Sequence, residues 1–312
     1  MLALELLLGF ALLVGGGELL VRGASALALR LGLSPLLIGL PVVGFGTSTP
    51  ELVTSLQAAL AGAPGIAVGN VVGSNTANIL LILGAAAVLM PFAVSPRAFR
   101  RDGAVLVASS LACLGVIATG ALTRGPGAAL VVGLIAYLAY AYVSERRSDD
   151  ASEGDAAVTA PTGSMPLTLI LAGGGIALTI LGARLLVGGA TDLARLWGVS
   201  EAVIGLTIVA IGTSLPELVT SVVAAFRREG DIAFGNVLGS NIYNVLGILG
   251  VTALVRPIPV PPSIAAFDIW VMLAATGALV AVAVTGWRVT RGEGVALLAS
   301  YAAYLGWLAT AA

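Results

Sequence analysis

The chain has 312 residues, of which 58% are apolar and 10% charged, with a mean hydropathy of +1.05 and a net charge of -1. This composition leaves too little polar surface to cover a soluble globule, so the sequence predicts an integral membrane protein surrounded by the lipid bilayer. The balanced charge excludes a basic surface for nucleic acid, and the absence of histidine with a single cysteine, Cys113, excludes imidazole and thiolate metal centres.

Ten apolar segments are long enough to cross a bilayer. The first five run near 2–21, 35–60, 66–92, 103–123 and 127–143, and the second five near 166–187, 202–226, 232–256, 266–286 and 294–311. A polar stretch, 144–165, separates the two groups and is interpreted as a cytoplasmic linker. The sequence therefore predicts an all-α integral membrane protein with ten transmembrane helices in two five-helix repeats, 1–143 and 166–312.

Arginine, the only positively charged residue type in the chain, is distributed unevenly among the predicted loops. If the N-terminus lies outside the cell, eleven arginines fall on the cytoplasmic side and four on the other side. Positively charged residues are enriched in cytoplasmic loops. We therefore expect a multi-pass protein of the inner (plasma) membrane with both termini outside.

The two halves of the chain repeat one another. Residues 18–102 align without a gap on 184–268, at a constant offset of 166, and between Gly46 and Gly84 24 of the 39 positions are identical to their counterparts. The match extends to Asp102 and Asp268, which we expect to be helix N-caps. Because five spans is an odd number, the second copy would enter the membrane from the opposite face. Inverted repeats of this kind place a substrate site near the bilayer midplane.

The second helix of each repeat carries a polar motif interrupted by proline, GTSTPE at 46–51 and GTSLPE at 212–217. Proline inside a helix removes a hydrogen bond and breaks or kinks the helix. We therefore expect helices 2 and 7 to be broken, with the backbone carbonyls of Gly44 and Ala210 available to a cation. The hydroxyl residues three and four positions before each glutamate share its helix face: Thr47 and Ser48 with Glu51, and Thr213 and Ser214 with Glu217.

The third helix of each repeat carries a polar stripe with a spacing of four, Asn70, Ser74 and Asn78 in the first and Asn236, Ser240 and Asn244 in the second. Short connections should turn these stripes toward the broken helices. Carboxylates, hydroxyls and amide oxygens are ligands for hard cations such as Ca2+, Na+ or Mg2+. A carboxylate at the centre of a membrane helix costs about 2.5 to 3.5 kcal/mol. One divalent cation, or more than one Na+, would neutralise two; alternatively, both glutamates are protonated and hydrogen-bonded within the bundle.

The motif pairs GTSTPE with GNVVGSNTAN and GTSLPE with GNVLGSNIYN resemble the alpha repeats of the cation/Ca2+ exchanger superfamily, in particular its prokaryotic Na+/Ca2+ exchanger-like branch. The resemblance covers the whole chain, with alpha motifs at 44–84 and 210–250. It implies antiport of Na+ and Ca2+ by alternating access, without a cofactor, as the first and sixth helices slide across a core of helices 2, 3, 7 and 8. It also implies an ion site lined by Thr47, Ser48, Glu51, Ser74, Asn78, Thr213, Ser214, Glu217, Ser240 and Asn244.

Asn244 departs from this pattern, because characterised exchangers of the family usually carry an aspartate there. One fewer negative charge leaves the coupling ion and the stoichiometry open. An H+- or K+-coupled divalent cation exchanger of the same fold is one alternative, although the Gly-Asn-Xaa-Xaa-Glu pattern typical of the H+/Ca2+ branch is absent. A cation channel fits paired broken helices less well. An enzyme is disfavoured because no histidine or lysine could activate a nucleophile. No sequence feature indicates a protein partner.

Overall fold

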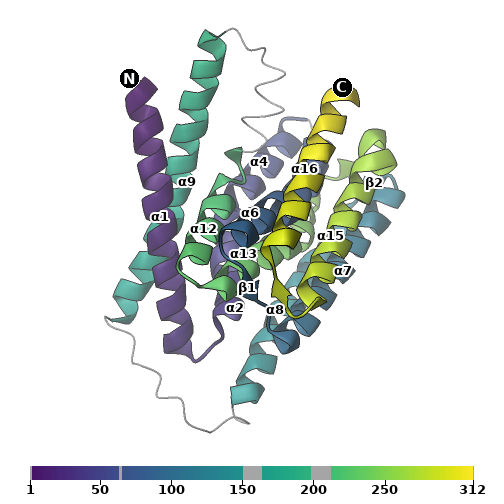
Figure 1. Cartoon of the computed structure of the whole chain (residues 1–312). Coiled ribbons are helices and arrows are strands. Elements are labelled where there is room, and N and C mark those ends of the chain that lie inside the picture. Colours follow the sequence, from purple (N-terminus) through teal and green to yellow (C-terminus); the bar gives the residue numbers. More distant parts are fainter. Residues whose placement is uncertain (1, 63–64, 150–163, 198–211, 312) are drawn as a thin grey trace.

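The computed structural model describes residues 2–62, 65–149, 164–197 and 212–311 (Figure 1). In chain order, the first half contains α1 (Leu2–Leu31), α2 (Pro35–Ile38), the π-helix η1 (Gly39–Gly44), α3 (Phe45–Thr47), α4 (Thr49–Leu60), α5 (Gly65–Ala77), the π-helix η2 (Asn78–Leu83), α6 (Gly84–Leu89), β1 (Phe92–Ala93), α7 (Pro96–Ala118), β2 (Ala121–Leu122) and α8 (Arg124–Asp149). The second half contains α9 (Met165–Leu196), α12 (Leu215–Phe226), α13 (Gly230–Tyr243), the π-helix η4 (Asn244–Leu249), α14 (Gly250–Val255), β3 (Ile258–Pro259), the π-helix η5 (Ile264–Asp268), α15 (Ile269–Val284), β4 (Arg288–Val289) and α16 (Arg291–Ala311).

Seven of the described helices are long and apolar enough to cross a membrane, or eight if the bent pair 35–47 and 49–60 is one span. This count confirms a helical membrane protein but does not reach the ten predicted spans. Of the predicted seventh helix, residues 202–211 lie outside the described part of the chain, and α16 is not among the seven. The described residues also form four β-strands, which the predicted all-α fold did not include, and each strand is two residues long.

The third helix of each half forms the centre of the molecule. In the spans 65–89 and 230–255, 78% and 83% of the apolar window is buried, against 28–39% for the other five. Large apolar side chains of those outer helices are exposed, as on Leu7 (70%) and Ile170 (67%), which suits a surface facing lipid. The two small ladders join the halves, because β1 pairs with β4 and β2 with β3.

Helices α1 and α9 lie side by side at one edge of the molecule (Figure 1). Their contact is built from glycines: a methyl group added at Gly16 would lie 2.5 Å from the main-chain nitrogen of Thr179 and 2.9 Å from the carbonyl oxygen of Gly175. Gly9 similarly meets Gly182, and Gly23 meets Ala172, so the two helices run antiparallel. Small residues at a shared face allow membrane helices to approach backbone to backbone.

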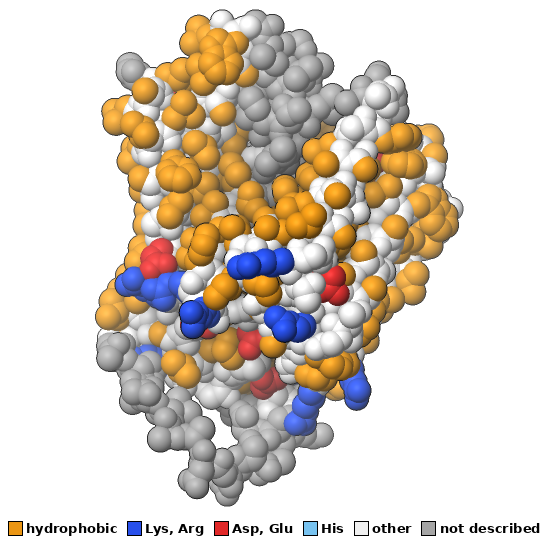
Figure 2. Space-filling view, in the orientation of Figure 1, with side chains coloured by type: hydrophobic (Ala, Val, Ile, Leu, Met, Phe, Trp, Pro, Cys, Tyr) orange, Lys and Arg blue, Asp and Glu red, His pale blue; other side chains and the backbone are white. Residues whose placement is uncertain are grey.

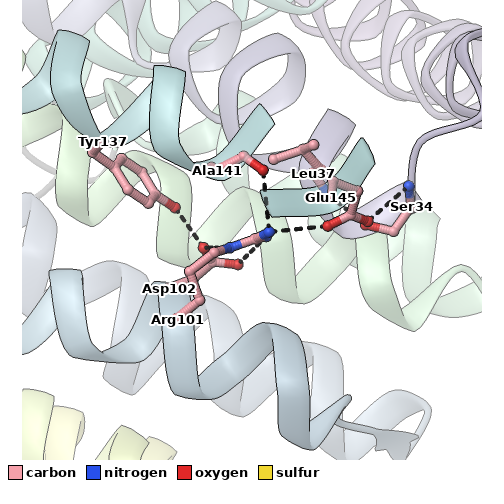
Figure 3. A network of polar contacts seen from close by, with 7 residues as sticks. All are labelled: Ser34, Leu37, Arg101, Asp102, Tyr137, Ala141 and Glu145. Atoms are coloured by element: carbon pink, nitrogen blue, oxygen red, sulfur yellow. Dashed lines mark hydrogen bonds and ion pairs between the residues drawn. The ribbon is translucent and has the colours of Figure 1, made fainter. Parts of the chain in front are cut away.

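A buried polar network joins α7, α8 and the start of α2 (Figure 3). Arg101 and Asp102 form an ion pair of 2.7 Å, and the Tyr137 hydroxyl donates to Asp102 over 3.0 Å. Arg101 also donates to Glu145 over 2.9 Å, and the other oxygen of Glu145 accepts from the backbone N–H of Ser34 over 3.1 Å. Since Ser34 caps α2, this network anchors the turn between α1 and the broken helix.

The prediction that Asp102 is an N-cap is wrong, whereas Asp268 does occupy the N-cap position of α15. Helix α7 begins at Ser95 and Pro96, so that Asp102 lies inside it with no exposed surface; proline is favoured in the first turn because its missing N–H has no partner there anyway. Asp268 precedes α15, but its side chain makes no capping bond and instead accepts from the Tyr304 hydroxyl over 2.9 Å.

Charged side chains are distributed unevenly over the surface. Figure 2 shows apolar side chains over the upper part of the visible face and most of the arginine, aspartate and glutamate side chains across its lower part. The termini lie at the upper end in the same orientation (Figure 1). On this face, the arginine side chains therefore lie toward the end opposite the termini.

Candidate cation site

Similar breaks in helical geometry at Ser48 and Ser214 precede the two helices that place the glutamates in the interior. Ser48 leaves helical geometry (φ −80°, ψ 9°) between α3 and α4, and the chain bends by 43° there. Ser214 has the same conformation (φ −91°, ψ 7°) immediately before α12. Glu51 and Glu217 therefore lie in the first turns of α4 and α12, where unpaired N–H groups and the helix dipole favour a carboxylate.

The carboxylates are bonded across the two halves of the chain. The Ser48 hydroxyl donates to Oε1 of Glu217 over 2.8 Å, and the Ser214 hydroxyl donates to Oε1 of Glu51 over 3.3 Å. Both glutamates are nearly inaccessible, with exposed fractions of 1% and 2%. Each half thus completes the polar environment of the other half's carboxylate, which makes this a single shared site.

The first residue of each polar stripe contacts the neighbouring glutamate helix, as the short connections between the helices predict. Asn70 Nδ2 donates to the backbone carbonyl of Glu51 over 3.2 Å and to the Ser55 hydroxyl over 3.0 Å. At the positions 166 residues later, Asn236 Nδ2 donates to the carbonyl of Glu217 over 3.1 Å and to the Ser221 hydroxyl over 2.8 Å. These equivalent bonds hold α5 against α4 in the first half and α13 against α12 in the second half.

The backbone carbonyl of Gly44 is hydrogen-bonded, whereas the sequence predicts that the helix break leaves it available to a cation. It accepts the N–H of Ser48 over 3.1 Å and the hydroxyls of Thr47 and Ser240 over 3.3 and 3.2 Å, so the break does not free it. The proline ring acts further along the chain, and the π-helical turn ending at Gly44 keeps this carbonyl within reach of donors. The equivalent carbonyl, that of Ala210, lies outside the described residues.

Four oxygen atoms at equivalent positions in the two halves are buried without a hydrogen-bond partner among the described residues. They are Oε2 of Glu51, Oε2 of Glu217, Oδ1 of Asn78 and Oδ1 of Asn244. Asn78 and Asn244 each begin a π-helix, η2 and η4, a local distortion often found at functional sites. Helix η2 contacts α12, and η4 contacts α4, so each asparagine lies on an element packed against the other half's glutamate helix.

Of the other predicted site residues, Ser74 and Ser240 are buried and Thr213 is half-buried. Sequence reasoning missed Asn75 and Asn241. Asn244 Nδ2 donates to Oδ1 of Asn75 over 3.0 Å, and Asn75 Nδ2 donates to the backbone carbonyl of Asn241 over 3.3 Å. Their identity in the two repeats was the available signal, but they lie one position off the polar stripes.

A cavity of about 510 Å³ lies between α4 and α9, and one predicted site residue, Thr213, lines it. Its lining includes Pro50 and Gln57 of α4, Arg184 of α9 and Thr213. In the other half, Gly17 of α1 packs directly against α12, where a methyl group would contact Val219 at 3.4 Å. The space between α9 and α4 therefore holds a cavity beside Thr213, whereas Gly17 brings α1 close to α12.

In the described residues, no group of three or more aspartate, glutamate, histidine or cysteine side chains comes together. Two carboxylates surrounded by neutral oxygens therefore form the charged part of the site. The family model described as "Sodium/calcium exchanger protein" matches residues 1–143 and 167–310. The chain belongs to the sodium/calcium exchanger family. It is therefore a multi-pass membrane protein of a transporter family.

Individual relatives of the family resemble this exchanger along almost their whole length. The putative antiporter CaxA of Alkalimonas amylolytica is 39% identical over 96% of this chain and 95% of its own. The inner membrane protein YrbG of Escherichia coli is 36% identical over 97% and 95%. A solved structure of the sodium-calcium exchanger NCX_Mj, soaked with zero Na+ and Ca2+, superposes with a TM-score of 0.85 at 31% identity, covering 99% of this chain and 100% of that one.

Proposed function

We propose that the protein is a secondary active antiporter of the inner membrane that exchanges Na+ for Ca2+ by alternating access. The observation that carries this proposal is the set of four buried, unpartnered oxygens from Glu51, Glu217, Asn78 and Asn244. A buried acceptor without a partner costs about 1 to 3 kcal/mol, and a cation would satisfy these four, which lie on helices that pack against one another across the two halves. Oxygen atoms of this kind suit Ca2+ and Na+.

The remaining ligands come from the hydroxyls and carbonyls around the glutamates. They are Thr47, Ser48, Ser74, Thr213, Ser214 and Ser240, with the backbone carbonyls of Gly44 and Ala210. Because Gly44 already accepts three hydrogen bonds, a cation there would displace a hydroxyl such as that of Ser240. The hydroxyl bonds to Glu51 and Glu217 would likewise be exchanged for bonds to the ion.

Exchange follows from charge balance. Two buried carboxylates are neutralised by one Ca2+ or by more than one Na+, and the same oxygens cannot hold both sets at once. An empty site would leave both charges buried in the membrane, which is costly. The loaded protein is therefore the form that changes conformation easily, and each ion drives the other across.

Alternating access requires two related conformations, which ten helices in two inverted five-helix repeats would supply. We assign 1–143 and 166–312 to the repeats, joined by the linker 144–165, with the alpha motifs at 44–84 and 210–250. Two features support this arrangement: α1 packs antiparallel on α9, and each two-stranded ladder pairs a strand of one half with a strand of the other. In it, α1 and α9 slide together across the core. The arginine side chains toward the end opposite the termini support an orientation with both termini outside.

The test is Ca2+ uptake into liposomes containing the purified protein. We expect uptake driven by an outward Na+ gradient and little uptake with a matched H+ gradient. If only an H+ or a K+ gradient drives uptake, that ion and not Na+ is the coupling ion. Uptake that needs no counter-ion gradient would indicate a channel.

A substitution links this activity to the site. Glu217→Gln keeps the size of the side chain and removes one of the two charges, so we expect Na+-driven Ca2+ uptake to be lost while the protein remains folded. Glu5→Gln, which changes a carboxylate near the start of α1, is the matched control and should leave uptake intact. Normal exchange by Glu217→Gln would remove this carboxylate from the mechanism.

A further inference from the structure

The side chain of Asn75 lies between the two repeats, in contact with Asn244. Both residues are buried, with exposed fractions of 1%. Asn75 Nδ2 donates to the backbone carbonyl of Asn241, and Asn75 Oδ1 accepts from Asn244 Nδ2 over 3.0 Å. The remaining polar atom of these two amides, Oδ1 of Asn244, has no partner among the residues that the structure describes.

This order of bonds determines which end of each amide faces which way. A backbone carbonyl can only accept a hydrogen bond, so Asn75 must direct its NH2 group toward Asn241. The side-chain oxygen of Asn75 then faces Asn244, so Asn244 must donate a hydrogen bond to it from its own NH2 group. The oxygen of Asn244 is left as the end directed away from Asn75. A main-chain atom thus controls, through Asn75, whether residue 244 presents an oxygen or an NH2 group.

We propose that Asn75 is a positioning residue that holds the oxygen of Asn244 toward the transported cation, and that this lets a neutral asparagine act as a ligand. The proposal rests on the exchange function proposed above. A carboxylate presents oxygen at both ends and needs no such control, whereas an amide that turns over presents NH2, which cannot bind a cation. Asn75 is therefore needed because this chain has an asparagine at position 244.

The equivalent position in the second repeat provides a comparison within the same molecule. Asn241 is also 1% exposed, but its Nδ2 donates to the carbonyl of Val237 on its own helix over 2.7 Å, and its Oδ1 has no partner. Among the described residues it therefore forms no hydrogen bond to the amide of Asn78 comparable to the bond between Asn75 and Asn244. Two asparagines of equal burial differ in whether they orient a neighbouring ligand.

The experiment measures the Ca2+ concentration for half-maximal Na+-driven uptake in liposomes and Ca2+ binding to the purified protein by calorimetry. Asn75→Leu keeps a similar volume and removes both hydrogen bonds. We expect the apparent Ca2+ affinity to fall about tenfold, the size expected for one lost hydrogen bond in a buried site, with a smaller change in maximal rate. Asn241→Leu, the matched control, should shift the affinity less than Asn75→Leu.

The double variant N75L/N244D separates positioning from packing. Because a carboxylate at position 244 presents oxygen in either orientation, adding Asn75→Leu to Asn244→Asp should not lower the Ca2+ affinity further. Asn75→Ala takes the place of Asn75→Leu if the larger side chain prevents folding. An unchanged affinity in the single variant, an equal loss in Asn241→Leu, or a tenfold loss that persists in the Asn244→Asp background would each overturn the proposal. Failure of the unaltered protein to transport Ca2+ would instead overturn the exchange function.

Discussion

The glycine contact between α1 and α9 predicts a specific effect of a single methyl group. In Gly16→Ala the new Cβ would lie 2.5 Å from the main-chain nitrogen of Thr179, about 0.9 Å closer than the 3.4 Å at which ordinary contact begins. The neighbouring atoms belong to the backbone and cannot rotate away, so the helices themselves must separate. Overpacking of this kind costs about 1 to 3 kcal/mol.

Gly15→Ala is the matched control, because Gly15 lies in the same helix and a methyl group there would meet nothing within 4 Å. Both substitutions gain up to about 1 kcal/mol from the higher helix propensity of alanine. The difference between the two variants therefore isolates the helix contact, and we expect Gly16→Ala to be less stable than Gly15→Ala by about 1 to 3 kcal/mol.

Thermal unfolding in detergent, followed by the loss of the monodisperse size-exclusion peak, measures this difference, and Na+-driven Ca2+ uptake measures its functional effect. Gly16→Ala should unfold at a lower temperature than Gly15→Ala and transport more slowly, because α1 and α9 are proposed to move as one unit. If both variants unfold at the same temperature, the backbone-to-backbone contact does not exist as described and the reasoning fails.

Two further predictions concern the ions. Asn244→Asp adds a negative charge beside the site and should lower the Na+ concentration needed for half-maximal exchange; an unchanged Na+ and Ca2+ dependence would show that the departure from the family pattern is neutral. Arg184 lines the cavity between α4 and α9, so Arg184→Gln should make entry of cations easier. Because electrostatic energy scales with ion charge, the fold change in apparent Ca2+ affinity should be the square of that for Na+, shrinking at high salt. Equal fold changes for the two ions would exclude an electrostatic role for Arg184.

Local sequence was sufficient for the class of protein and for the broken helix. The apolar composition can be satisfied only by lipid, and the proline of GTSTPE cannot continue an undistorted helix, so the interruption at Ser48 follows from the residues themselves. The spacing of four between Asn70, Ser74 and Asn78 likewise places them on one helix face, and Asn70 does contact Ser55 on the broken helix.

Local sequence could not place Asp102, because the start of α7 depends on residues 95 and 96 rather than on the aspartate. A capping residue and a buried ion-pair partner have the same amino-acid identity. What distinguishes them here is the approach of Tyr137 and Arg101, and Tyr137 comes from another helix.

Contacts between the repeats were decided by tertiary structure. The bonds from Ser48 to Glu217 and from Asn244 to Asn75 each join residues 169 positions apart, and helical periodicity relates only residues three or four positions apart. The sequence by itself thus determined the repeat and the polar motifs that both halves carry. Only the packing of one half of the chain against the other decided which oxygen of each glutamate is bonded and which has no partner among the described residues, because the bonding hydroxyl comes from the opposite half.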